Sequence, residues 1–152
     1  MDKFQTTVGN GLGVAVPGTL VEAAESYKLL EHFVTEDDTC SVGEFVRLGT
    51  KEGYVKGAAS DGDVIGIIVK DQYLTGCELG MKLPAGITCS VAVFGVIAVK
   101  NTSTASATLL DDVFLKKDGT LAFSKESVAS ASKTHWAVKQ GAEPNGIVFV
   151  TR

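Results

Sequence analysis

The feature that most constrains the fold is a long apolar run, residues 89–101, CSVAVFGVIAVKN. A strand with one buried face alternates apolar and polar residues, whereas residues 91–99 are apolar throughout and would present apolar side chains to both faces of a sheet. Both faces therefore need a cover, which either other segments of the same chain or a second subunit must supply. Gly95 interrupts the run and predicts a bulge, a bend or a close approach of the backbone.

Further short runs of β-branched and aromatic residues flank this one, and turn signals end most of them. Strands are predicted at 42–48, 54–56, 64–69, 89–101, 112–116, 120–123, 134–138 and 146–150. Lys117-Asp118-Gly119 separates two of them and favours a hairpin, because Asp-Gly suits the positive φ of tight turns. No regular strand–helix alternation is present, so the sequence predicts an all-β fold, a small β-barrel or jelly-roll-like sandwich of seven to eight short strands.

The first 34 residues of the chain differ from this strand pattern. Residues 1–18, MDKFQTTVGNGLGVAVPG, are rich in glycine and predict an extended N-terminal arm, which leaves 19–152 as a single domain. Residues 19–34 are ambiguous. Thr19 and Glu22 have the spacing of a capping box, and apolar residues then recur at helical intervals, so the local pattern favours a helix.

Composition limits the partners. The net charge is −4, and the scattered lysines are joined by only two arginines, Arg47 and Arg152. Nucleic acid or an anionic membrane would require a concentrated basic face, so both are disfavoured as partners. The longest apolar run is far shorter than the ~20 residues of a membrane span, and the first residues do not resemble a signal peptide, so we expect a soluble, non-secreted protein.

The residues that carry chemistry form no recognisable constellation. Cys40, Cys77 and Cys89 lack metal-ligand spacing and predict reduced, buried thiols, with neither a metal nor a cofactor. The carboxylate clusters at 36–38, 61–63 and 111–112 are predicted to lie in solvated turns. The two histidines, His32 and His135, are far apart, and no nucleophile motif is present, so no enzyme is predicted. For a ligand site, the residues to inspect are His135, Trp136, Asp111 and Asp112.

The strand motifs follow one another in a distinctive order. They are VGEFVRLG (42–49), GYVKGA (53–58), SDGDVIGIIVKDQY (60–73), LPAGITCSVAVFGVIAVKN (83–101), DDVFLKKDGTLAF (111–123) and GIVFVTR (146–152). In order and spacing they resemble the bacteriophage structural cement, or capsid decoration, proteins. The resemblance covers most of the chain, including the glycine-rich arm.

The resemblance implies a small barrel or jelly-roll-like body without catalysis, which clamps neighbouring major capsid subunits from outside the shell. It implies the major capsid protein as partner, and a place on the outer capsid surface of the virion after assembly in the host cytoplasm. It also implies an extended path over 28–36, which overrides the local helical pattern there and leaves a short helical turn open at 20–27.

Contacts to the capsid or to other subunits are predicted in the arm and in the apolar run. The candidates are Phe4, Val8, Leu12, Val14, Val16, Val93, Phe94 and Gly95. If a second subunit covers the run, the protein is a homo-oligomer, a dimer or a trimer. Two other functions stay open: a small β-barrel ligand-binding protein or enzyme, and a tail-associated adhesin module.

Overall fold

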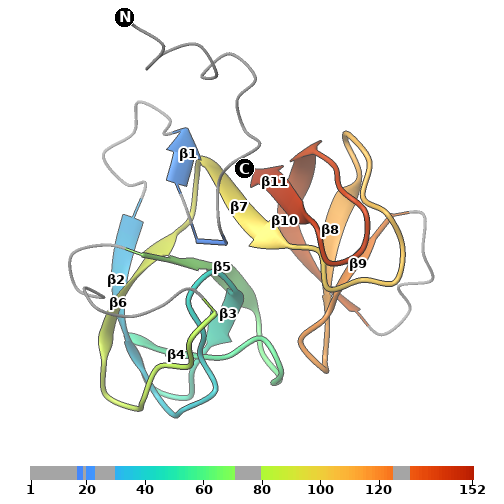
Figure 1. Cartoon of the computed structure of the whole chain (residues 1–152). Helices are drawn as coiled ribbons and strands as arrows, with labels where there is room; N and C mark the ends of the chain where they lie inside the picture. The colour runs from blue at the N-terminus through green and yellow to red at the C-terminus, as the bar shows by residue number, and fades with distance from the viewer. Residues whose placement is uncertain (1–16, 19, 23–29, 71–79, 125–130) are drawn as a thin grey trace, which may run out of the picture.

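The computed structural model describes residues 17–18, 20–22, 30–70, 80–124 and 131–152. These residues form eleven strands in two sheets and no helix, so the all-β prediction is confirmed. One sheet closes into a small barrel, and the other has six strands (Figure 1). Within the described ranges, no helix is long and apolar enough to cross a membrane.

The barrel contains five strands from the first part of the chain, in the order β2-β4-β3-β5-β6. They are β2 (Leu30–Thr35), β3 (Phe45–Leu48), β4 (Tyr54–Lys56), β5 (Val64–Val69) and β6 (Thr88–Ala92). The barrel closes because β2 pairs on one side with β6, antiparallel, and on the other with β4, parallel.

The six-stranded sheet is antiparallel and has the order β1-β7-β11-β10-β8-β9. Its strands are β1 (Leu20–Glu22), β7 (Val96–Lys100), β8 (Asp112–Lys116), β9 (Leu121–Phe123), β10 (Ala131–Gln140) and β11 (Ile147–Thr151). The predicted hairpin at Asp118-Gly119 joins β8 to β9, and Gly119 has a φ of 90° that favours glycine.

The apolar run does not form one strand. It divides at residues 93–95 into β6, which belongs to the barrel, and β7, which belongs to the six-stranded sheet. Gly95 has a φ of 109° and marks the bend between them, one of the alternatives that the sequence offered. Residues on both faces of the run, such as Ile97 and Ala98, are buried within the single chain. Intrachain cover therefore suffices for the two strands of the run, although Phe94 on the turn between them is exposed, and the predicted homo-oligomer loses the doubly covered strand that motivated it.

The second half of barrel strand β5 is likewise buried on both of its faces. Ile68 on β5 packs with Val91 in an apolar cluster inside the barrel, whereas its neighbour Ile67 faces the six-stranded sheet and joins the main core. In that core the rings of Phe45, from the barrel, and Trp136, from the sheet, meet edge to face with centroids 6.3 Å apart. The barrel thus has one core inside and shares a second with the sheet.

The helical pattern over 19–34 is wrong where the structure describes it. Leu20–Glu22 is strand β1, whose Leu20 pairs with Ile97, so a helical turn at 20–22 is excluded; residues 19 and 23–29 lie outside the described ranges. The extended path implied over 28–36 is confirmed for Leu30–Thr35. Pairing with β7 and β6 satisfies the backbone here and outweighs the capping pattern, which is a weak preference.

The strands are more numerous than predicted, and the difference has two causes. Strands β1 and β2 fall in the segment with the helical pattern, and the single strand predicted at 89–101 is two strands. In addition, β10 is longer than predicted. A register shift in it surrounds His135, which has a φ of 67°.

The end of the predicted arm is part of the body. The amide of Gly18 donates to Ala98 O at 2.8 Å, and a Cβ at Gly43 would lie only 2.8 Å from Pro17. Residues 17–18 are therefore packed against both sheets. The extended arm itself falls on residues 1–16, outside the described ranges, so its conformation and the division into arm and domain stay predictions.

Candidate functional site

One buried arginine ties the barrel to the six-stranded sheet. Arg47 lies on β3, is only 1% exposed, and directs its guanidinium at acceptors from both parts of the fold. The acceptors are Ala58 O (2.9 Å), Gly62 O (2.8 Å), Ser132 Oγ (3.0 Å), Leu115 O (3.2 Å) and Lys116 O (3.2 Å). Burial lowers the pKa of Arg47, an effect that the carboxylate of Asp61 opposes. Arg47 is thus a cross-brace within the molecule and unavailable to a partner.

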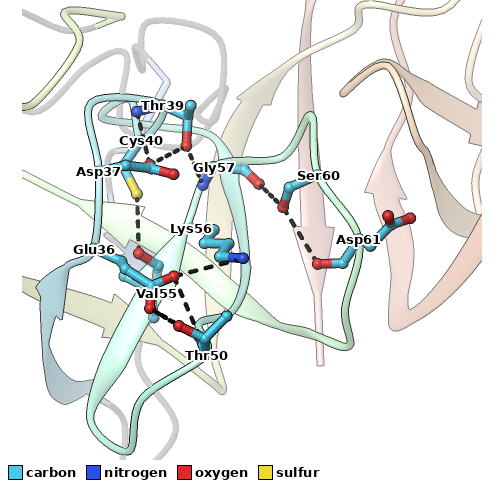
Figure 2. Close-up of polar contacts among 10 residues, drawn as sticks. All are labelled: Glu36, Asp37, Thr39, Cys40, Thr50, Val55, Lys56, Gly57, Ser60 and Asp61. Carbon is cyan, nitrogen blue, oxygen red and sulfur yellow. Dashed lines mark hydrogen bonds and ion pairs between the residues drawn. The ribbon is translucent and has the colours of Figure 1, made fainter.

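The acidic cluster at 36–38 serves turns, as predicted. Figure 2 shows Glu36 accepting hydrogen bonds from the amide and hydroxyl of Thr50 and lying 3.6 Å from the ammonium of Lys56. The hydroxyl bond from Thr50 is the main reason that the pKa of Glu36 is lowered. Asp37 accepts from the amide and hydroxyl of Thr39. The carboxylates therefore fix the connection between β2 and β3 to the hairpin around β4.

A serine–histidine pair is present, but its geometry does not favour catalysis. Ser90 Oγ lies 3.2 Å from His32 Nδ1, and the two residues pair across β2 and β6. Ser90 is fully buried, so its hydroxyl is out of reach of a substrate. A nucleophile has to contact the atom that it attacks, and the Ser90 hydroxyl is buried between β2 and β6, where a substrate cannot reach it.

The residues proposed for a ligand site come from neighbouring strands, since Asp112 on β8 pairs with Ala137 on β10, but their side chains differ in burial. Trp136 is 1% exposed in the core, while His135 beside it is exposed on the other side of β10. Asp111 accepts hydrogen bonds from Thr108 and Ser124, whereas Asp112 is exposed. In each adjacent pair, one residue is exposed and its neighbour is more buried. Across the described residues no group of three or more His, Cys, Asp or Glu side chains could hold a metal ion.

A cleft lies where the barrel meets the six-stranded sheet. Its walls include Phe45 from β3, Val99 and Lys100 from β7, and Leu121 from β9. Of the described residues that line it, Glu44 is the only carboxylate and Lys100 the only cation. The lining is mostly apolar and lacks a converging set of polar groups, which a selective small-molecule site normally has.

Two of the three cysteines are confirmed as buried thiols: Cys40 and Cys89 form no disulfide and lie in the apolar cluster inside the barrel. The Cys40 thiol donates a weak hydrogen bond to Val55 O at 3.7 Å (Figure 2). Burial, reinforced by the negative charges that Cys89, Asp37 and Glu44 can carry, raises the pKa of Cys40 to about 12. Cys77 lies outside the described ranges.

We expect Cys40 and Cys89 to be inert toward a thiol reagent at about pH 8, because the thiolate is the reactive form and both sulfurs are buried. The measurement uses Cys77→Ser, so that only these thiols are counted; both should react once the chain is unfolded in denaturant. Fast labelling of the folded protein would contradict the burial.

The same thiol predicts a pH dependence. The folded state holds the Cys40 proton more tightly than the unfolded state, whose thiol has a pKa of 9.0. The contribution of Cys40 to stability is therefore complete below about pH 9 and is lost as the pH rises toward 12.

The turn between β6 and β7 carries three of the predicted contact residues. Val93 is half-buried and Gly95 is buried, and Gly95 exchanges backbone hydrogen bonds of 3.3 Å with Arg152. Phe94 is 42% exposed, and the guanidinium of Arg152 lies 5.8 Å from its ring centroid. This aromatic–arginine pair is a suitable contact for another protein, since interface cores are enriched in both residue types. The other five candidates fall within residues 1–16, outside the described ranges.

Sequence reasoning missed a second exposed apolar site. Five large apolar side chains are exposed among the described residues: Leu48, Met81, Phe94, Leu109 and Leu110. Only Leu109 and Leu110 are adjacent. The signal available in the sequence was a Leu-Leu pair at the end of the Ser/Thr/Ala segment 101–108, which nothing local distinguishes from the start of strand β8.

These features define the class of the protein. Phe94, Leu109 and Leu110 are exposed on connections between strands, where another protein can contact them, so the molecule is an all-β protein with surface sites suited to binding another protein.

Comparisons with known proteins identify the family to which the chain belongs. The family model described as structural cement protein (E217 gp24/Pam3 gp6) matches residues 4–152. The chain therefore belongs to the phage structural cement proteins; it binds the capsid of the virion and associates with capsid proteins. A chain from the capsid of Myoviridae phage XM1 has the same fold, with a TM-score of 0.64 at 15% identity over 92% of this chain and 91% of that chain. No curated protein sequence matches this one.

Proposed function

We propose that the protein sits on the outer surface of the capsid and braces neighbouring major capsid subunits without catalysing a reaction. The observation that carries the proposal is the family match over residues 4–152. The exposed Phe94–Arg152 pair adds a contact of suitable chemistry on the body. A brace needs several modest contacts to more than one neighbour, because each contact after the first is made at a high effective concentration.

The arm supplies the second contact in this proposal. Residues 1–16 contain Phe4, Val8, Leu12, Val14 and Val16, separated by glycine, alanine and polar residues. Burying each apolar anchor against a partner contributes about 1.5–3 kcal/mol, set against the entropy of ordering the chain. If extended, the segment reaches about 50 Å from Pro17, far enough to contact a second capsid subunit.

The remaining parts of the proposal concern partners and setting. The net charge of −4 and the scarcity of arginine disfavour nucleic acid and membrane partners. Reduced thiols suit assembly in the host cytoplasm. Self-association as a dimer or trimer rests only on the usual symmetric association of small bodies, and light scattering tests it: a mass near 15.9 kDa would contradict it.

Deletion of residues 2–16 is expected to weaken capsid binding about tenfold or more and to lower the resistance of the particle to heat. The melting temperature of the free protein should stay within a few degrees, because Pro17 and Gly18, which pack on the body, are retained. Co-sedimentation with purified capsids, compared with purified tails, measures the affinity.

The outcomes separate the alternatives. Binding of the full chain to tails rather than capsids would support an adhesin and contradict the proposal. Unfolding of the truncated protein would make the arm a part of the domain. Undiminished capsid binding after truncation would leave the body as the sole anchor.

A further inference from the structure

Two adjacent leucines stand out from the surface at a strained turn. In the segment that joins β7 to β8, Leu109 is 63% exposed and Leu110 is 78% exposed. Leu110 also has a φ of 72°, a left-handed conformation that leucine rarely adopts and that glycine or asparagine would accept more readily. An exposed leucine at such a position is unfavourable twice over in the free protein, through hydration of its side chain and through backbone strain. Strain of this kind is typical of sites whose side chain has a function.

The turn is held rigidly. The amide and hydroxyl of Thr108 both donate to the Asp111 carboxylate at 2.9 Å, and the Asp111 amide donates back to Thr108 O at 3.1 Å. The Leu110 amide donates to Val138 O, and the Val138 amide donates to Asp111 O, both at 2.9 Å. The two leucines are thus carried on a closed loop bonded to β10, and their side chains are presented in a fixed direction.

The approach to the turn is fixed as well. Buried Asn101 donates from Nδ2 to Ala105 O at 3.0 Å and to Ala142 O at 3.1 Å, and the Ala107 amide donates to Ala142 O at 2.9 Å. Gly141 leaves no room for a side chain, since a Cβ there would lie 1.9 Å from Ala107 O. The whole segment from 101 to 111 is therefore seated on the sheet, and only its tip is apolar and exposed.

We propose that Leu109 and Leu110 form a preorganised apolar knob that inserts into an apolar pocket of a major capsid subunit. This rests on the proposed capsid-bracing function and names one of its contacts. Preorganisation favours binding because little conformational entropy remains to be lost when the knob docks. The turn needs no rearrangement, and the partner has only to offer an apolar concavity.

A capsid subunit fits the knob better than a second copy of this chain. Two leucine side chains bury far less than the ~1,200 Å² that a stable protein–protein interface needs, so the knob alone cannot hold a dimer together. On a capsid the knob would be one contact among several. The arm and the Phe94–Arg152 pair would hold it close to its pocket, so that even a small contact adds to the affinity. The knob lies on the connection between β7 and β8, whereas Phe94 lies on the turn between β6 and β7, so the two contacts belong to different connections.

The test compares capsid affinity with stability in the full-length protein. Leu110→Asn suits the positive φ and removes the apolar side chain; it should weaken binding to purified capsids about tenfold and leave the melting temperature unchanged or raise it by a few degrees. Leu109→Ser should weaken binding by a similar factor. Leu110→Gly, which also accepts the positive φ, is a second variant in case asparagine perturbs folding. Leu48→Ser, at an exposed leucine on β3, is the matched control and should change the affinity less than about twofold.

Three results would overturn the proposal. If the unaltered protein binds capsids and Leu110→Asn binds equally well, the knob is not a contact, although the bracing function stands. If the unaltered protein does not bind capsids at all, the proposed function fails and the knob fails with it. If Leu110→Asn instead lowers the mass found by light scattering, a second copy occupies the knob.

Discussion

Replacing Arg47 by methionine is expected to lower the free energy of unfolding by about 3–5 kcal/mol, one of the largest effects open to a single substitution here. Methionine fills a similar volume but removes one donor from each of four backbone carbonyls. Two of them, Ala58 O and Lys116 O, keep a backbone donor in Ser60 and Gly119, and the other two lose the bond from Arg47. Each unsatisfied buried acceptor costs about 1–3 kcal/mol, and relief from burying the guanidinium offsets only part of that sum. Since these carbonyls come from both the barrel side and β8, the loss falls where the two sheets meet.

Chemical denaturation measures this effect: the denaturant concentration at the midpoint of unfolding should fall, while the slope of the free energy against denaturant concentration stays the same. Arg47→Lys keeps the charge but replaces a planar fork of five donors by one ammonium, so it should also destabilise the protein. Lys133→Met, which removes an exposed cation from β10 next to Ser132, is the control and should stay within about 0.5 kcal/mol of the unaltered protein. If Arg47→Met stayed within about 1 kcal/mol, the cross-brace would not hold the sheets together.

The sequence allowed the fold class to be predicted because its local signals and its tertiary structure mostly agree. Asp118-Gly119 forms the hairpin that its turn chemistry indicates, and Val64–Val69 is a strand as its β-branched residues suggest. Leu20–Glu22 and Leu30–Thr35 could not be predicted from their own residues. Their strand pairing is with β7 and β6, far along the chain, and helical periodicity says nothing of such partners.

The candidate site was predictable only where a local pattern marks it. The apolar run drew attention to Phe94 and Gly95, although it gave no indication that Gly95 is where the chain passes from one sheet to the other. Arg47 showed no local signal, because its acceptors lie between residues 58 and 132 and meet only in the folded protein. The Leu109–Leu110 pair depends on a positive φ, which no preference of leucine would suggest.

The tight closure of the barrel depends on the absence of a side chain at Gly66. This glycine lies within β5, and a Cβ there would be 2.2 Å from Ala92 O and 2.8 Å from Val91 Cγ1 on the neighbouring strand β6. The clash is with backbone, which cannot move aside as a flexible side chain can. Ala92 is also the last residue of β6 before the chain bends into the six-stranded sheet, so a displacement of its backbone would disturb the strand pairing in both sheets.

Gly66→Ala is therefore expected to lower the free energy of unfolding by about 2–4 kcal/mol, since strands β5 and β6 must separate to admit the methyl group. Alanine also restricts the unfolded chain, which stabilises the folded state by about 0.4–1 kcal/mol. The expected loss already includes this gain. Gly53→Ala is the matched control. Gly53 has open space around its Cβ position and a φ of 81°, so alanine there should cost only the backbone strain, about 1–2 kcal/mol. Equal losses in the two variants, measured by the same denaturation experiment, would mean that the barrel tolerates a side chain between β5 and β6.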